Sequence, residues 1–283
     1  MSAVQLKRWN MSIGAGQPLF VIAGVNVLES LDLALTVGRE LKAITAKLGL
    51  PFVFKASFDK ANRSSIKSFR GPGLTDGLAM LAEVKRTLNV PIATDIHEVA
   101  HALPAAAVAD VVQIPAFLCR QTDLIVAAAR ATSAAEGWLH VKKAQFLAPW
   151  DCKNIISKAR EAAPNLDIVL CERGSSFGYN NLVVDMLAIG EMQRLGVPVT
   201  IDATHAVQLP GADPRTSGAS TGGRREGVPI IAKAAVAAGA DGVFLEFHPD
   251  PDKALCDGPS CLALDGAAQL LATLKGVHQA VRA

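Results

Sequence analysis

The fold is best read from Pro51-Phe-Val-Phe54 and the residues that follow it, Lys55-Ala-Ser-Phe-Asp-Lys-Ala-Asn-Arg-Ser-Ser-Ile-Lys-Ser-Phe-Arg70. The apolar run, bounded by a proline, is typical of a buried strand. Lys55 to Arg70 hold five basic residues, four serines and one acid without strand or helix periodicity, which predicts a long loop. Such loops are usually functional, and clustered lysine, arginine and serine donors suit a phosphate. A solvated basic loop or a nucleic-acid patch is the alternative.

The same strand-and-loop unit recurs along the chain. Apolar runs begin near Phe20, Phe52, Ile92, Val111, Leu139, Ile168, Val199 and Gly242. Stretches with helical spacing lie between them, clearest at residues 31–48, 76–88, 124–131, 181–195 and 228–238, with a last helix expected over about 262–281. Alternating strands and helices imply parallel pairing, and strands apolar throughout imply burial on both faces. Eight such units predict an α/β fold, the TIM (β/α)8 barrel.

One barrel is expected to take up the whole chain, residues 1–283, because no linker or low-complexity segment divides it. Residues 4–17 alternate loosely, so residues 1–17 are predicted to form a short N-terminal β-hairpin that caps one end. A doubly wound sheet is the competing architecture. It would not require eight units, and no G-x-G-x-x-G follows the first strand.

Composition narrows the class of protein. Half of the 283 residues are apolar, enough for one sizeable core, and the net charge of +2 argues against a general nucleic-acid binder. The five cysteines form no C-x-x-C pair, so reduced thiols in a cytoplasmic protein are expected. The first residues lack the apolar core of a signal peptide, and no run of 18 apolar residues predicts a membrane span.

A barrel places its catalytic groups at the carboxyl ends of its strands and in the loops that follow them. Polar residues stand at that end of every predicted strand: Asn26, Glu29, Lys55, Lys60, Asn62, Arg63, Ser64, Asp95, His97, Gln113, Lys142, Lys143, Gln145, Glu172, Arg173, Asp202, His205, Glu246, His248, Asp250 and Asp257. The loops at the opposite end are mostly glycine, proline, alanine and asparagine. This asymmetry predicts an active site at the carboxyl ends.

The lysines and arginines among these residues predict an anion site. Six cations in one cavity would repel each other unless anions bind there, which suits two phosphorylated groups or a phosphate and a carboxylate. The alternative is that half of the six point outward and pair with surface acids, and this is expected of one or two. A Schiff-base aldolase that uses Lys55 or Lys142 is a further alternative, since that chemistry needs a desolvated amine.

Three other readings of the polar residues remain open. Asn26, His205, Glu246 and Asp257 include a histidine and two carboxylates, which suit a divalent metal, but an asparagine amide is a weak fourth ligand. No G-x-S-x-G elbow supports a serine nucleophile, and Cys256 is expected to be a buried, inert thiol. The loop from Ala203 to Arg225, rich in glycine and serine, is predicted to be a mobile lid, with a disordered insertion as the alternative.

Several motifs resemble those of the 3-deoxy-D-manno-octulosonate 8-phosphate synthase family. They are Phe54-Lys-Ala-Ser-Phe-Asp-Lys-Ala-Asn-Arg-Ser-Ser65 with Arg70-Gly-Pro-Gly73, Gln113-Ile-Pro-Ala-Phe-Leu-Cys-Arg-Gln-Thr-Asp123, Phe177-Gly-Tyr-Asn-Asn-Leu-Val-Val-Asp185, Asp202-Ala-Thr-His205, His248-Pro-Asp-Pro251 and Cys256-Asp-Gly-Pro-Ser260. The similarity spans nearly the whole chain. It implies a homotetrameric barrel in the cytoplasm of Gram-negative bacteria. Such an enzyme condenses phosphoenolpyruvate with D-arabinose 5-phosphate and releases phosphate, on the way to lipopolysaccharide.

The resemblance also implies roles for individual residues. Lys60, Lys142 and Arg173 would hold phosphoenolpyruvate, with Lys55 and Gln145 beside it. Asn62, Arg63 and Ser64 would take the pentose phosphate at a site that a neighbouring subunit completes. Asn26, His205 and Asp257 would position the water and move its proton, with Lys60 counted among the catalytic groups. The other expected substrate-binding residues are Asp95, Gln113, Lys143 and Glu246.

Asn26 and Cys256-Asp-Gly-Pro259 resemble the metal-independent class of this family, so no metal or other cofactor is expected. Gln145-Phe-Leu-Ala-Pro-Trp-Asp151 and Ala206-Val-Gln-Leu-Pro-Gly211 are closer to metal-dependent members, and Ala144 replaces an expected proline or glycine. Two alternative functions stay open. One is the related synthase that uses erythrose 4-phosphate and makes a heptulosonate phosphate; the other is a non-catalytic barrel that binds anionic metabolites.

Overall fold

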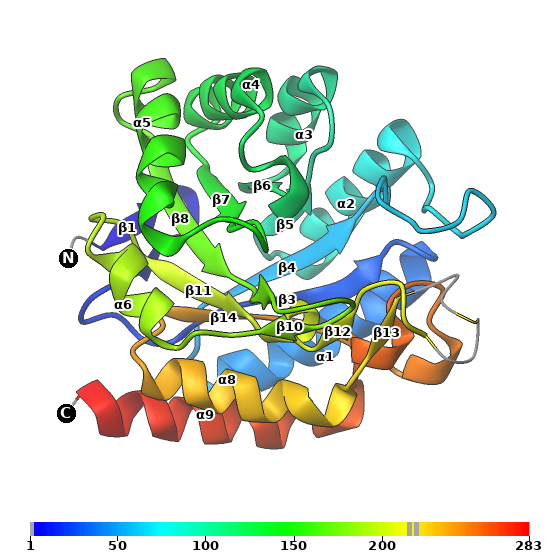
Figure 1. The fold of residues 1–283 in the computed structure, drawn as a ribbon. Coiled ribbons are helices and arrows are strands. Elements are labelled where there is room, and N and C mark those ends of the chain that lie inside the picture. Colours follow the sequence, from blue (N-terminus) through cyan, green and yellow to red (C-terminus); the bar gives the residue numbers. More distant parts are fainter. Residues whose placement is uncertain (1–2, 214–216, 218–220, 283) are drawn as a thin grey trace.

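The computed structural model describes residues 3–213, 217 and 221–282. Within them, eight parallel strands close into a barrel surrounded by helices (Figure 1), which confirms the predicted architecture. The strands are β3 (Phe20–Val27), β4 (Phe52–Ser57), β5 (Ile92–Asp95), β6 (Val111–Ile114), β7 (Trp138–Lys142), β8 (Asp167–Glu172), β11 (Val199–Asp202) and β14 (Gly242–His248). They pair in chain order, and the pairing of β14 with β3 closes the ring.

Helices cover the outside of the barrel and bury an apolar layer against the strands. They are α1 (Leu31–Leu48), α2 (Leu74–Leu88), α3 (Ala102–Val108), α4 (Thr122–Ala134), α5 (Cys152–Ala162), α6 (Leu187–Gln193), α8 (Val228–Ala237) and α9 (Ala267–Arg282). Local signals set the limits of α1, because the Ser30 side chain accepts a hydrogen bond from Leu33 N and Gly49 ends the helix at φ 66°. In the part of the chain that the structure describes, no helix has the length and apolarity needed to cross a bilayer.

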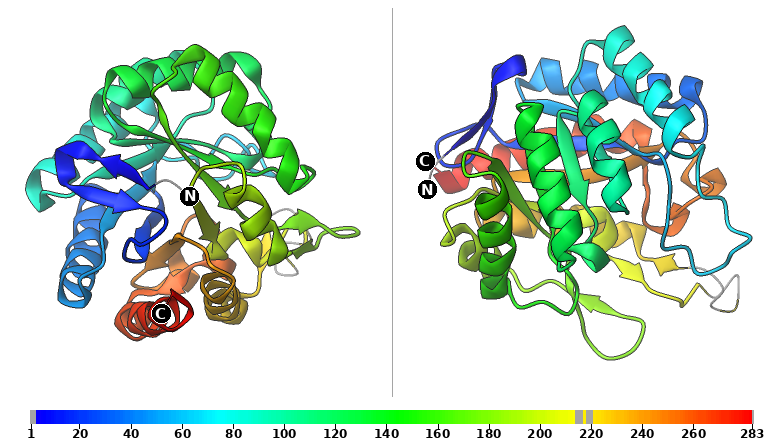
Figure 2. Two further views of the ribbon diagram at one scale, coloured as in Figure 1. Left: turned by 90° about the vertical axis from the view of Figure 1, so that its left-hand side faces the viewer. Right: turned by 90° about the horizontal axis from the view of Figure 1, so that it is seen from above.

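The predicted N-terminal hairpin is confirmed. Strands β1 (Val4–Leu6) and β2 (Met11–Ile13) pair antiparallel and lie across the end of the barrel where the strands begin (Figure 2). Leu6 and Ile13 pack into one apolar cluster with Phe20 and Trp138, whose rings lie 5.2 Å apart. The hairpin therefore closes the end of the barrel where the strands begin, which we call the lower end. The end where the strands finish, the upper end, is left free for a site.

Three sequence predictions need correction. Lys55–Ser57 belong to β4 and are not loop. Residues 181–195 do not form one helix, because β10 (Leu182–Val183) pairs with β9 (Ser175–Ser176). Helix α6 begins at Leu187, whose backbone N–H donates to the Asp185 side chain. The last helix begins at Ala267, since β15 (Leu262–Ala263) adds to β14.

An irregularity in β3 places Asn26. The register between β3 and β4 shifts between Gly24 and Val27. A Cβ atom at Gly24 would lie 2.0 Å from the Lys55 carbonyl oxygen, so only glycine permits this approach of the two strands. Bulges of this kind re-aim side chains, and here the Asn26 amide points at His205, Glu246 and Asp257.

Candidate active site

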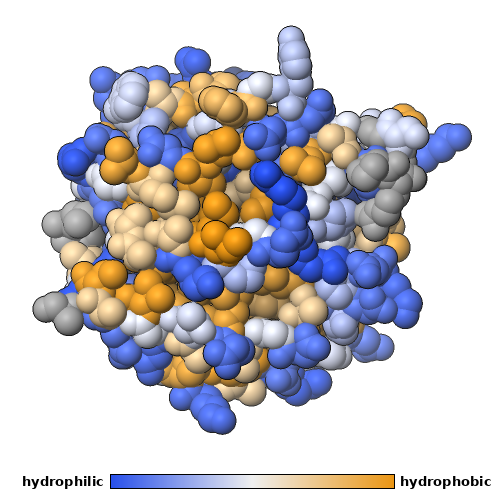
Figure 3. Space-filling model, turned by 60° about the horizontal axis from the view of Figure 1, so that its bottom comes forward, coloured by the Kyte–Doolittle hydropathy of each residue, from blue (hydrophilic) through white to orange (hydrophobic). Residues whose placement is uncertain are grey.

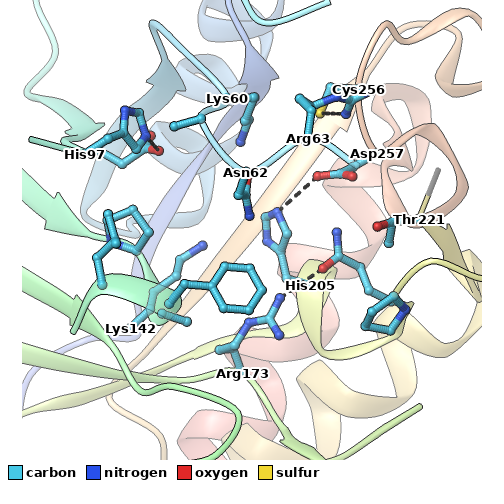
Figure 4. Close-up of a pocket in the computed structure, with 18 of the residues that line it drawn as sticks. Lys60, Asn62, Arg63, His97, Lys142, Arg173, His205, Thr221, Cys256 and Asp257 are labelled. Atoms are coloured by element: carbon cyan, nitrogen blue, oxygen red, sulfur yellow. Dashed lines mark hydrogen bonds and ion pairs between the residues drawn. The ribbon is translucent and has the colours of Figure 1, made fainter. Parts of the chain in front are cut away.

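A cavity of about 400 Å³ opens at the carboxyl ends of the strands. Figure 4 shows Lys142 from the end of β7 together with labelled side chains from the segments that follow β4, β5, β8, β11 and β14, all around this cavity. We call it the mouth pocket. Its lining includes these predicted residues: Lys55, Lys60, Asn62, Arg63, Ser64, Asp95, Gln113, Lys142, Gln145, Arg173, His205 and Asp257. Residues that sequence reasoning left unassigned also line it: Ser68, His97, Phe117, Gln208, Thr221 and Cys256.

Three predicted residues do not line the mouth pocket. Asn26 and Glu246 lie behind it, where each contacts His205, which does line it. Lys143 is buried, and its ammonium donates to the carbonyl oxygens of Ala144 and Leu147 and to Ser175 Oγ. Lys143 is the one of the six cations outside the pocket lining, and its closest carboxylate, Glu172, 3.6 Å away, is itself buried. The expected outward pairing with surface acids is therefore wrong for these six described cations.

Lys55 lies at the centre of a buried polar cluster. Its ammonium donates to Ser57 Oγ at 2.8 Å and Glu246 Oε1 at 3.1 Å, and Asp95 Oδ1 is 3.7 Å away. Burial and the neighbouring Lys60 lower the pKa of Lys55. A lowered pKa is what a Schiff-base lysine needs, yet Glu246 and Asp95 lie beside this amine and oppose the shift. The arrangement favours Lys55 as a fixed positive charge.

His205, Asp202 and Lys142 form a second cluster. Lys142 Nζ lies 2.6 Å from Asp202 Oδ2 and 3.7 Å from the centre of the Phe244 ring. His205 Nδ1 lies 2.8 Å from Asp202 Oδ2, and the His205 backbone N–H donates to Asp202 Oδ1. Burial lowers the pKa of His205, but Asp202 and Glu246 outweigh it and raise the pKa above its ordinary value. Asp202 and Glu246 therefore favour the protonated form of His205, whose Nε2 lies on the side of the ring away from Asp202.

That Nε2 atom faces two carboxylates. It lies 3.5 Å from Glu246 Oε2 and 3.6 Å from Asp257 Oδ2. Although burial opposes it, neighbouring His205 lowers the pKa of Asp257, and His205 and Lys55 lower that of Glu246 to about 2. Asp257 has φ 50°, a left-handed backbone that is costly for aspartate and is held here beside the pocket.

Asn26 completes this group as a donor. Its Nδ2 donates to Glu246 Oε2 and, at 3.1 Å, to Asp257 Oδ2, while its Oδ1 is buried without a partner. The amide hydrogens thus occupy the space between the carboxylates. Among the described residues, no three histidine, cysteine, aspartate or glutamate side chains have the arrangement of a metal site.

Two arginines of the pocket have N–H groups without a hydrogen-bond partner. Arg173 Nη2 donates to Gln208 Oε1 at 2.9 Å, but its Nη1 is buried without a partner. Arg63 contacts Cys256 Sγ and leaves Nε buried and unpartnered. Burial raises the pKa of Cys256, as an inert thiol requires. Unpaired buried donors are rare in proteins, and these two belong to side chains that line the mouth pocket, where an anionic ligand would lie beside them.

The predicted lid is in part a short hairpin. After α7 (Ala203–Ala206), β12 (Gln208–Leu209) pairs with β13 (Gly222–Gly223), and Gln208 and Thr221 line the mouth pocket. Residues 214–216 and 218–220 of the proposed lid lie outside the described residues. Gln208 follows a strand end by six residues, so its bond to Arg173 had no signal in the sequence.

The fold and the site define a class: a (β/α)8-barrel protein with a cationic pocket at the carboxyl ends of its strands. The sequence matches the family described as DAHP synthetase I over residues 2–283, and the chain belongs to that family.

Curated relatives carry a more specific name. A protein of Hahella chejuensis (strain KCTC 2396) is 52% identical over 282 residues, which are 100% of this chain and 97% of that protein. A Pseudomonas putida (strain GB-1) protein is 54% identical over 273 residues, covering 96% and 94%, respectively. A Desulfotalea psychrophila (strain LSv54 / DSM 12343) protein is 53% identical over 269 residues, covering 95% and 93%. All three are named 2-dehydro-3-deoxyphosphooctonate aldolase.

Proposed function

We propose that this protein condenses phosphoenolpyruvate with D-arabinose 5-phosphate and water to give 3-deoxy-D-manno-octulosonate 8-phosphate and inorganic phosphate, a step toward lipopolysaccharide. The names of relatives at 52–54% identity support this reaction. The single observation that carries it is the mouth pocket, in which cations from separate strand ends face one cavity. Two phosphorylated substrates would neutralise them.

We assign different parts of the pocket to the two substrates. Lys60, Lys142 and Arg173 come from the loop after β4 and the ends of β7 and β8, and we assign them to phosphoenolpyruvate. Asn62, Arg63 and Ser64 lie on the outer part of the same loop, and we assign them to the pentose phosphate. Burial opposes it, but Glu246 and Asp95 raise the pKa of Lys60, so this ammonium keeps its charge throughout.

In the proposed reaction, C3 of phosphoenolpyruvate attacks the aldehyde of the open-chain sugar, and the aldehyde oxygen takes up a proton. Water adds to C2 and loses a proton, and the hemiketal phosphate then releases phosphate by C–O cleavage. Lysine and arginine charges stabilise the developing oxyanions. Asn26, His205 and Asp257 are assigned to the water and its proton, because their polar atoms converge within 3.6 Å.

We also propose that the reaction needs no metal. The Asn26 amide donates to Glu246 and Asp257 in the place where a fourth ligand would otherwise be required. Dialysis against EDTA should leave the rate of phosphate release unchanged. Loss of activity with EDTA and its recovery with manganese or zinc would contradict this assignment.

The protein is further proposed to be a cytoplasmic homotetramer, each chain a single barrel domain, with the pentose phosphate site completed by a neighbouring subunit. Large apolar side chains stand exposed on loops at the mouth: Phe117, Phe146, Trp150, Phe177 and Tyr179. Apolar side chains also gather near the middle of the face in Figure 3. Exposed apolar patches commonly mark protein interfaces. Light scattering of the purified protein at assay concentration tests this proposal.

One assay tests the proposed reaction. The purified protein is mixed with phosphoenolpyruvate and either D-arabinose 5-phosphate or erythrose 4-phosphate, and released phosphate and product mass are measured. We expect phosphate and an eight-carbon product with the pentose. Faster release with erythrose 4-phosphate would favour the heptulosonate phosphate synthase. No release with either sugar would favour the non-catalytic barrel.

A further inference from the structure

Lys143 and Glu172 form a buried ion pair that no part of the proposed reaction uses. Both side chains are only 1% exposed. Lys143 follows the last residue of β7, and its Nζ donates to Ala144 O at 3.2 Å, Leu147 O at 3.3 Å and Ser175 Oγ at 3.1 Å. The ammonium therefore holds the turn of residues 144–147, which carries Gln145.

Glu172 makes the equivalent contacts from β8. Its Oε1 accepts the backbone N–H groups of Arg173 at 3.0 Å and Gly174 at 2.6 Å, while Oε2 faces Lys143. Gly174 has φ 87°, so the turn after Arg173 is tight. Burial raises the pKa of Glu172, while Lys143 and these two N–H groups oppose the shift. The carboxylate therefore holds the turn that carries Arg173.

The two turns are also joined directly. The Ser176 backbone N–H donates to the Gln145 carbonyl at 3.0 Å, and Lys143 N donates to Cys171 O at 2.8 Å. Gln145 Oε1 and Arg173 Nη1 are buried without partners and belong to residues that line the mouth pocket. Each turn thus carries a side chain that lines the pocket and has an unsatisfied polar atom, and the Lys143–Glu172 pair lies between the two turns.

We propose that Lys143 and Glu172 are positioning residues that fix Gln145 and Arg173 for the phosphoenolpyruvate half of the pocket, without touching substrate themselves. This inference rests on the proposed function. Its physical basis is that backbone and hydroxyl hydrogen bonds fix Lys143 Nζ and Glu172 Oε1, so the buried pair holds one geometry, while Glu172 Oε2 has only the 3.6 Å contact with Lys143. A broken pair would leave a buried charge that must move or be hydrated.

The test uses Lys143→Met, Glu172→Gln and Lys143→Arg in the full-length protein. Binding of phosphoenolpyruvate alone is measured by calorimetry, and KM for each substrate is measured by phosphate release. Lys143→Met and Glu172→Gln should each weaken phosphoenolpyruvate binding by about 10- to 100-fold, because a shift of an ångström in a binding group costs this much. KM for the pentose phosphate should stay within about twofold, and Lys143→Arg should restore part of the loss.

Lys85→Met is the matched control. Lys85 also pairs with a buried aspartate, Asp110, at 2.9 Å, but at the opposite end of the barrel. It should lower stability and leave phosphoenolpyruvate binding within about twofold of the wild type. If Lys143→Met does not fold, Glu172→Gln, which keeps the shape of the side chain, carries the test.

Two results would overturn the positioning role. One is phosphoenolpyruvate affinity that stays at the wild-type value in Lys143→Met and Glu172→Gln while their Tm falls. The other is an equal loss for both substrates. Failure of the proposed function looks different, because the wild type itself would then neither bind phosphoenolpyruvate nor release phosphate.

Discussion

The two ends of this barrel use the same kinds of charged residue in opposite ways. At the lower end, Asp110 stands directly before β6 and accepts Ile92 N, Trp9 Nε1 and Lys85 Nζ, each at 2.9 Å. Asp241 stands directly before β14 and accepts Val199 N and Gln193 Nε2 at 2.9 Å and Arg282 Nη2 at 2.7 Å. Each aspartate thus joins the start of one strand to the next strand, a helix cation and one further donor.

At the upper end, the acids are paired too, but the set of partners is incomplete. Asp95, Asp202 and Glu246 hold Lys55, Lys142 and His205 in place. Several polar atoms there remain buried without a partner: Asn26 Oδ1, Arg63 Nε, His97 Nδ1, Gln145 Oε1 and Arg173 Nη1. The lower end also has buried atoms without a partner, Trp138 Nε1 and Thr132 Oγ1, but these belong to neutral side chains. Its charges are satisfied and serve stability, whereas charges with unused donors at the upper end can take a ligand.

Removing a cation from the upper end should give the largest effect on activity. Arg173→Met should lower kcat/KM by about 100- to 1,000-fold, the usual loss when a donor to a developing oxyanion is removed. Because burial lowers the pKa of Arg173, its charge is costly in the free protein, so Tm should not fall. Steady-state kinetics and a thermal melt check this. A large fall in Tm with little loss of activity would show that Arg173 serves stability, as the charges at the lower end do.

Removing a charge from the lower end should do the reverse. Asp110→Asn leaves Lys85 without its carboxylate and places an amide where three donors converge, so unfolding free energy should fall by about 2–3 kcal/mol. Urea denaturation measures the loss, and kcat should remain that of the wild type. An Asp110→Asn variant with normal stability and a lower kcat would show that this aspartate affects the active site.

His140 lies between the two ends and sharpens the comparison through pH. It is buried between Gln113 and Thr200, and burial, with Lys142, lowers its pKa to about 3. Below pH 6.5 His140 is protonated in the unfolded chain but not in the folded protein. The free energy of unfolding therefore falls as pH falls, by up to about 1.4 kcal/mol per pH unit.

His140→Asn should remove this dependence. Relative to the variant, the wild type should lose about 2 kcal/mol between pH 7.5 and pH 5, measured by urea denaturation at both values. Equal losses for the two proteins would mean that His140 is protonated in the folded state.

The smallest expected effect is at the hairpin. Trp9→Phe keeps a ring near Lys85 but removes the N–H that donates to Asp110, so unfolding free energy should fall by about 1 kcal/mol. Denaturation of Trp9→Phe beside Asp110→Asn and the double variant measures the coupling. Fully additive losses would show that Trp9 and Asp110 do not act together.

The strands were predictable because burial on both faces makes each one a continuous apolar run. The same property hid the direction of side chains, since a run apolar throughout shows no alternation. Lys142 and Lys143 are adjacent in sequence, yet one reaches Asp202 beside the pocket and the other turns back to carbonyl oxygens. Residues 181–195 failed as a helix because a pairing between β9 and β10 overrides helical spacing there.

By itself, the sequence determined the number and order of the units, the polar end of the barrel and the excess of cations there, because these follow from which residues lie next to each other in the chain. Tertiary structure alone decided which charges are satisfied. Asn26 meets Glu246 across 220 positions, through closure of the ring and the register shift between Gly24 and Val27, and Arg173 meets Gln208 across 35. Whether a polar atom is paired depends on the distance across the barrel, which local sequence does not contain.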